Sequence, residues 1–359
     1  MKIKVFIKKG YRPLIFLFAA SAAALSVVFS GECANGILRG IKMSLTQLVP
    51  SMLFIMIIAD FIVRSGILSF RGKIFSAVSY ALFGVSPQGM SVIVLSLFGG
   101  YPVGAKLIAS LYERGEISKA ESRHLSLFCV CAGTGFLINF LGESLLSCKE
   151  IGAIIFLSQV LSVIIMGICM KPFAPKAEYK PKSAPQIRTP FSQMLVESVE
   201  SGAKVCLSAC TAVTAFSGII GLFEGAVNMG ASQLLTGVIV GLLEITTAVS
   251  KLHGTVGIEI LAFLVGFGGV CVHFQIFSIL SKVGISKKAF LLCRLVQGAA
   301  TAALCALFME VFAPSAEVFA TVSQAPSALY PATVISSAAL VATAVLFILT
   351  LRRKTVCAE

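Results

Sequence analysis

Runs of apolar residues long enough to cross a lipid bilayer recur along the chain, separated by short polar segments. A spanning helix needs about 20 such residues. Of the 359 residues, 57% are hydrophobic and 13% are charged, whereas a soluble domain is about 25% charged. Backbone groups in lipid must find partners within the chain, and runs of this length satisfy them as helices. The sequence therefore predicts an all-α polytopic membrane protein with about eight spanning helices plus re-entrant or broken helices.

The charge distribution predicts how the chain is oriented. Lys and Arg outnumber Asp and Glu by 29 to 16, which gives a net charge of +13. The basic residues gather between the apolar segments and at both ends of the chain, which is the pattern of cytoplasmic loops in membrane proteins. We therefore expect both termini in the cytoplasm and the lipid bilayer as the main partner. No nucleic-acid-binding motif accompanies the charge, so the sequence argues against nucleic acid as a partner.

A basic, proline-rich segment at residues 171–190 divides the chain and predicts an extended cytoplasmic linker. Similar elements follow one another in the same order on each side of it, which favours two related halves over a chance likeness between Gly-rich helices. The predicted organisation is a membrane helix at 1–35, a first half at 36–170, the linker, a second half at 191–288, and terminal helices with a basic tail at 289–359. A cleaved signal peptide is the competing interpretation of the first segment.

Glycine interrupts the apolar pattern near the middle of the first half. Gly99 and Gly100 precede Pro102 and Gly104, and Lys106 then lies in apolar sequence. The apolar piece that follows is too short to span a bilayer and leads into a polar loop at residues 113–123. We expect a re-entrant hairpin and a discontinuous helix here, because broken helices in lipid occur where they are buried in protein or line a cavity.

Charged and polar residues within the apolar runs are the candidate site residues. Lys106 is a cation that could pair with an anionic solute, or it could extend to the interface and pair with Glu113 or Glu116. Glu244 lies in an apolar run beside Thr246, and we expect it to pair with a lysine such as Lys106 or to bind a proton or cation.

The second glycine break supplies further candidates. His273 and Gln275 follow Gly268 and Gly269, and they could read hydrogen-bonding groups on a solute or form an ordinary contact between helices. Thr134 is a weaker candidate. The predicted solute-binding residues are therefore Gly99, Gly100, Lys106, Thr134, Glu244, Thr246, Gly268, Gly269, His273 and Gln275.

Enzymatic chemistry is not predicted. Asp60 is the only aspartate, so a pair of catalytic aspartates is impossible, and the three histidines do not form a zinc-binding set. Most of the 11 cysteines lie in apolar sequence and are expected to be packing residues, although Cys33 and Cys148 could form a disulfide on the outer side. We expect no catalytic residue, no metal and no cofactor.

Three blocks of sequence resemble the sporulation integral membrane protein family of spore-forming bacteria, the YlbJ type. They are Gly99-Gly-Tyr-Pro-Val-Gly-Ala-Lys106, Gly241-Leu-Leu-Glu-Ile-Thr246 and Gly266-Phe-Gly-Gly-Val-Cys-Val-His-Phe-Gln-Ile276. The resemblance implies a nucleoside-recognition or gate domain, which nucleoside and ferrous-iron transporters also contain.

The resemblance also implies transport of dipicolinate into the forespore, and hence a place in the bacterial cell membrane or the outer forespore membrane. The expected partner is a small anionic solute, and a homo-oligomer is possible. The alternatives are a transporter of a nucleoside or another small solute, and a membrane scaffold of sporulation that transports nothing.

Overall fold

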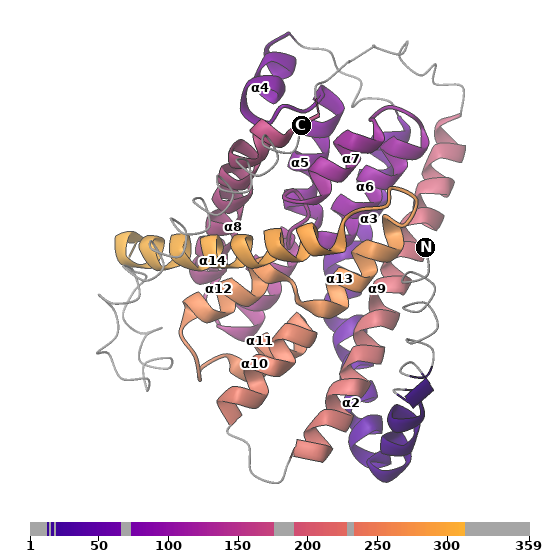
Figure 1. Cartoon of the computed structure of the whole chain (residues 1–359), viewed down its shortest axis with the longest axis vertical. Coiled ribbons are helices and arrows are strands. Elements are labelled where there is room, and N and C mark those ends of the chain that lie inside the picture. The colour runs from indigo at the N-terminus through magenta and orange to yellow at the C-terminus, as the bar shows by residue number, and fades with distance from the viewer. Residues whose placement is uncertain are drawn as a thin grey trace, which may run out of the picture.

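The structure is a computed structural model that describes residues 19–65, 73–175, 190–227 and 233–312, with Pro13, Phe16 and Leu17 before them. Every regular element in these residues is helical, which confirms the predicted all-α membrane architecture (Figure 1). Five helices in the described residues are long and apolar enough to span a membrane, and a bent pair could form a sixth. The linker residues 176–189 and the part of the predicted terminal helices and basic tail at 313–359 lie outside the described residues.

Two long helical rods pack against each other through small residues. The first consists of α2 (Ser30–Met43), η1 (Ser44–Leu48) and α3 (Val49–Arg64), and the second is α9 (Phe191–Val227). A Cβ added at Gly40 would lie 2.7 Å from the Cα of Thr214, so the glycine permits close approach of the two backbones. The one-turn π-helix η1 ends two residues before Pro50, which lacks the N–H of a regular turn.

The first half continues with an α-helical hairpin. The short helix α4 (Lys73–Phe83) precedes α5 (Pro87–Gly99), at an angle of 80° between their axes. The chain then reverses at Gly100 into α6 (Tyr101–Glu113), so that Gly104 faces Ser96. The predicted re-entrant hairpin is therefore formed by α5 and α6, before the polar loop rather than around it.

The second half contains a hairpin built in the same way. α10 (Gln233–Leu243) and α11 (Ile245–Leu252) are antiparallel, because Gly237 faces Leu252 and Gly241 faces Ala248. The apolar run that the sequence presents as continuous is thus broken at Glu244. The two hairpins lie toward opposite ends of the molecule in Figure 1.

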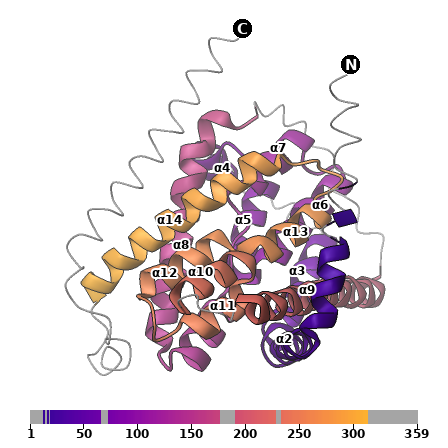
Figure 2. The same ribbon diagram turned by 60° about the horizontal axis from the view of Figure 1, so that its bottom comes forward.

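A broken helix and a continuous span follow each hairpin. After α5–α6 come α7 (Lys119–Ser126), a non-helical stretch at 127–133, η3 (Gly135–Leu145) and α8 (Lys149–Met170), which η4 (Lys171–Phe173) extends. After α10–α11 come α12 (Ile258–Phe267), α13 (Gly269–Ile279) and α14 (Lys287–Phe312), which Figure 2 shows from another side. The order of rod, hairpin, broken helix and span therefore occurs twice. This order supports the predicted two related halves, whose boundaries stay a prediction.

Candidate functional site

The tips of the two hairpins line one cavity with a volume of about 50 Å³. Gly100 comes from the first tip and Glu244 and Thr246 from the second, while Gln275 comes from α13. Four of the predicted site residues thus line a single cavity, although they are up to 175 positions apart in the chain. The remaining lining residues are mostly apolar: Leu48, Met52, Tyr101, Pro102, Ala132, Gly133, Phe136, Ala209, Val213, Ile245 and Val272. We refer to this cavity as the tip cavity.

The tip of the first hairpin can be formed only by glycine. Gly100 has φ +87°, a region that L side chains rarely adopt, and a Cβ there would lie 3.0 Å from the backbone nitrogen of Gly133. The helix α6 begins at the next residue, and no side chain caps its N-terminus. Pro102 has no N–H, so the amides of Tyr101 and Val103 are the first-turn donors without a partner within the helix. They lie at the N-terminus of α6 together with the positive end of the helix dipole.

The tip of the second hairpin carries its own carboxylate. Glu244 is 1% exposed and is the N-cap of α11. Its Oε1 accepts a hydrogen bond from the amide of Thr246 at 2.8 Å, and its Oε2 accepts one from the amide of Thr247 at 2.7 Å. Among the described residues Glu244 has no lysine partner, so the predicted pairing with a lysine is not found. Backbone amides hold this carboxylate instead.

The break between α12 and α13 connects the two tips. Gly268 has φ +89°, and a Cβ there would lie 3.1 Å from the ring of Tyr101 in the first hairpin. A Cβ on Gly269 would lie 3.4 Å from the amide nitrogen of Ile245 in the second hairpin. Tyr101 also donates a hydrogen bond from its hydroxyl to the carbonyl of Val265. The predicted glycines of this break therefore lie between the hairpin tips.

Two predicted site residues lie away from the tip cavity. Lys106 lines two other cavities that share no lining residue with it. His273 is 3% exposed, its Nε2 lies 2.8 Å from the carbonyl oxygen of Phe267, and its ring packs between Phe267 and Phe290. A shared site of Lys106, His273 and Glu244 is therefore not formed, because Lys106 is more than one helical turn beyond the tip of α6 and His273 completes an aromatic cluster.

The weaker candidates at the first tip have structural partners. Thr134 donates a hydrogen bond from its hydroxyl to the carbonyl of Phe98 at 3.2 Å, which ties the unwound segment to the hairpin. Gly99 is packed against Val103 of the next turn. These residues shape the tip from outside the cavity lining.

The unwound segment at 127–133 depends on two buried side chains that the sequence interpretation missed. Arg294 of α14 is fully buried and donates hydrogen bonds to the carbonyls of Leu127 (3.0 Å) and Val130 and to the side chain of Gln297. Gln159 of α8 donates from Nε2 to the carbonyl of Ala132 at 2.7 Å. The sequence did indicate Arg294 as a candidate, because it is an arginine in the apolar run 289–312 and an intramembrane charge needs a partner.

All ten cysteines within the described residues are free thiols. Cys148 is buried, and its Sγ donates to the Oε2 of Glu150 at 3.2 Å. The possible disulfide between Cys33 and Cys148 is therefore not formed in this structure.

Comparisons with known proteins give one informative match. No family model and no solved structure matches the chain, so the expected gate domain stays a prediction. The sporulation integral membrane protein YlbJ of Bacillus subtilis (strain 168) is 24% identical over 323 residues, which cover 79% of this chain and 78% of that protein. The match extends over most of both sequences and agrees with the three motif blocks. The chain is therefore similar, over most of its length, to a YlbJ-type sporulation integral membrane protein.

Proposed function

We propose that this protein transports a small organic anion across the membrane through the tip cavity. The meeting of two hairpin tips with a broken helix at one internal cavity carries the proposal. Repeat-built transporters place their substrate sites where discontinuous helices meet, with helix N-termini directed at anionic groups. A scaffold protein needs no such interrupted helices.

The chemistry of the tip cavity favours an anion. The uncapped N-terminus of α6 offers backbone amides and the positive end of a helix dipole. Gln275 adds a side-chain amide, and the carboxylate of Glu244 is held by two backbone amides of α11. The apolar remainder of the lining suits an aromatic or aliphatic body on the solute.

Dipicolinate fits these requirements as the specific solute. It is a planar dianion, so one carboxylate can bind at the N-terminus of α6 while the ring packs on the apolar wall. The tip cavity, at about 50 Å³, holds only a few water molecules. This volume is too small for dipicolinate, so binding requires the tips to separate. Transport toward the forespore, through the outer forespore membrane of a sporulating cell, is the role that this solute implies.

A nucleoside is the second candidate solute within the same mechanism. It would use the apolar wall and Gln275 without needing the positive end of α6. Competition between uridine and dipicolinate therefore separates the two solutes, because only an anion gains from the helix dipole.

Uptake into vesicles tests the proposal. Purified protein is reconstituted in vesicles that contain terbium ions, whose luminescence increases when dipicolinate enters. We expect uptake by the native protein and a decrease of about tenfold in Gln275→Leu, which removes one hydrogen bond to the charged solute. Asn139→Leu is the matched control, because Asn139 is an exposed amide of η3 outside the tip cavity. Uptake no faster than in empty vesicles would overturn the proposal.

A further inference from the structure

Three cavities follow one another along the seam between α3, α6 and α9. On each of these helices, the residues that line successive cavities are about one turn apart. The series runs from the tip cavity toward Arg64, the last residue of α3. The series on α9 reads Val213, Ala209, Val205, Ser201, Glu197 and Met194. This arrangement indicates a single route along the seam rather than three unrelated voids.

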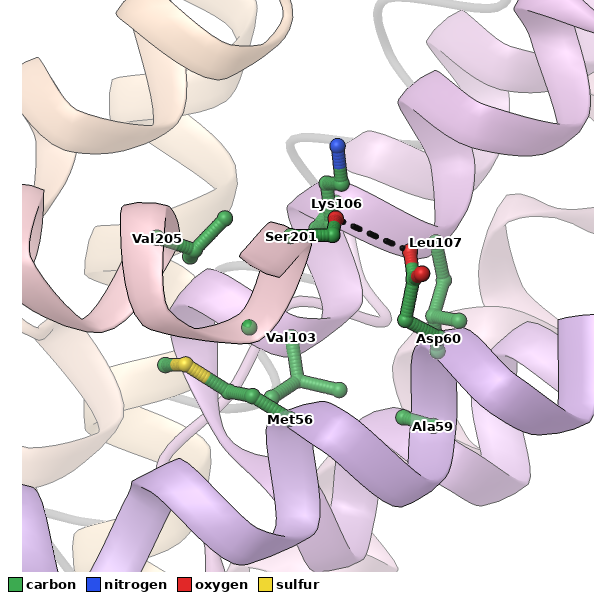
Figure 3. A pocket seen from close by; sticks show the side chains of 9 residues that line it. Met56, Ala59, Asp60, Val103, Lys106, Leu107, Ser201 and Val205 are labelled. Atoms are coloured by element: carbon green, nitrogen blue, oxygen red, sulfur yellow. Dashed lines mark hydrogen bonds between the residues drawn. The ribbon is translucent and has the colours of Figure 1, made fainter. Parts of the chain in front are cut away.

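The middle cavity is the narrowest of the three. Its volume is about 10 Å³, the size of a single water molecule. Figure 3 shows Met56 of α3 and Val103 of α6 below the cavity and Val205 of α9 to its left, with Asp60 to its right and Lys106 at the top. An apolar constriction of this kind blocks a charged solute, because the solute would lose its hydration there.

The third cavity is large, at about 330 Å³, and polar. Its carboxylates already have partners. Asp60 accepts hydrogen bonds from Arg64 at 2.5 Å and from Ser201 at 3.1 Å, and Glu197 accepts from Arg64 and from Gln193. Arg64 therefore holds two carboxylates together at the cavity wall.

The other charges at this cavity are also engaged, with one exception. Arg114 pairs with Glu116 at 2.8 Å, and Glu113 pairs with Lys282 at 2.6 Å. Lys106 lines the cavity and is only partly exposed, yet it has no ion pair and no hydrogen bond with any described residue. Among the described charged groups that line this cavity, the Lys106 ammonium is thus the one whose donors are still available, and they suit an acceptor such as a carboxylate.

We infer that the large cavity is the access site of the transported anion, that Lys106 binds its carboxylate there, and that Met56, Val103 and Val205 form the closed gate between this site and the tip cavity. The inference rests on the proposed function. The cavity is lined by three cations and three carboxylates, so its net charge is zero. Because the attraction for an anion is therefore weak overall, the anion can leave Lys106 for the tip cavity. The basic residues near Arg64 place this end in the cytoplasm.

Variants of Lys106 test the access site in the terbium vesicles, with dipicolinate added outside inverted membranes. In Lys106→Gln we expect the KM to rise about tenfold with the maximal rate within about twofold, because a charged hydrogen bond made at the outset is lost. Lys106→Arg should restore most of the affinity. Lys149→Gln is the matched control, since Lys149 is exposed and pairs with Glu143 outside the seam.

Variants of the gate test the route. Val103→Phe fills the middle cavity and should reduce the maximal rate at least about tenfold without changing the KM, whereas Met56→Ala opens it and should raise the rate. Elution as a single monodisperse peak in detergent shows that each variant is folded. One outcome would overturn the access route alone: native protein transports dipicolinate, Lys106→Gln keeps the native KM, and both gate variants keep the native rate. The proposed function would then stand. If native protein transports nothing, the proposed function falls and this inference falls with it.

Discussion

In each half the chain reverses direction at the tip of a helical hairpin, but the residues that form the two tips differ. The first hairpin turns at Gly100, whose positive φ and lack of a side chain allow contact with Gly133, and it leaves the N-terminus of α6 uncapped. The second turns at Glu244, whose side chain caps α11. One tip is therefore open to an anion and the other is occupied by the protein's own carboxylate. In the proposed function, a carboxylate of the solute therefore binds at the first tip and Gln275 contributes from α13, while the second tip itself has a structural part.

The broken helices differ in a corresponding way. The first break is a non-helical stretch at 127–133, which requires Arg294 and Gln159 to satisfy its carbonyls. The second break is a single residue, Gly268, between the end of α12 and the start of α13. A long unwound segment exposes more backbone groups and needs more buried partners. Stability should therefore respond more strongly to the partners of the first break.

The largest effect is expected for Arg294→Met. The change leaves the carbonyls of Leu127 and Val130 without donors in the interior, so we expect a loss of about 3–5 kcal/mol in stability. Thermal unfolding in detergent measures it. The control is Arg39→Met, which breaks a partly exposed pair with Glu224 and should lose less than about 1 kcal/mol. Equal losses would show that the unwound segment does not depend on Arg294.

Gly100→Ala should have the next largest effect. The positive φ is unfavourable for alanine by about 1–2 kcal/mol, and the contact with Gly133 adds strain of about the same size. Gly254→Ala is the matched control, because Gly254 has φ +73° but nothing lies within 4 Å of an added Cβ. Both variants place alanine at a positive φ, so the difference between their unfolding temperatures measures the cost of the contact with Gly133. A zero difference would contradict the close contact of the first tip with the unwound segment.

Glu244→Gln distinguishes a structural from a transport role of the second tip. One oxygen acceptor is lost at the N-terminus of α11, so we expect a loss of about 1–2 kcal/mol. Ser118→Ala removes the cap of α7, which lies outside the tip cavity, and should lower stability by about 1 kcal/mol. Because the Glu244 carboxylate is held by backbone amides of α11, terbium-reported uptake should follow stability and change equally in the two variants. A decrease found only in Glu244→Gln would contradict a structural part for the second tip and give it a role in transport.

The smallest effect is expected for Tyr101→Phe. The hydroxyl of Tyr101 bonds the first hairpin to the carbonyl of Val265, and its loss should lower stability by about 1 kcal/mol. Tyr112→Phe, on the same helix, should change stability by less than about 0.5 kcal/mol, because the Tyr112 hydroxyl makes no hydrogen bond with the described residues. An unchanged unfolding temperature in Tyr101→Phe would show that the link between α6 and α12 is not needed.

The sequence by itself determined the membrane class, the helical fold and the two glycine breaks. Long apolar runs leave few ways to satisfy a backbone in lipid, so composition and run length were sufficient for the class. The glycines at Gly100 and Gly268 were recognisable because no other residue adopts their conformation readily. The same information placed Gly100, Glu244, Thr246 and Gln275 among the candidates that the tip cavity brings together.

Only the tertiary structure decided which charges share a site. Lys106 and Glu244 are both isolated charges in apolar sequence, yet one lines a polar cavity and the other caps a helix. Residues of α3 and α9 line the cavity that holds Lys106, and the local backbone binds Glu244. A one-dimensional pattern cannot specify neighbours over such separations. Arg294 was missed for the same reason, since its acceptors lie more than 160 residues away in the chain. Local composition fixes what each segment can become, while packing decides which buried polar groups satisfy one another.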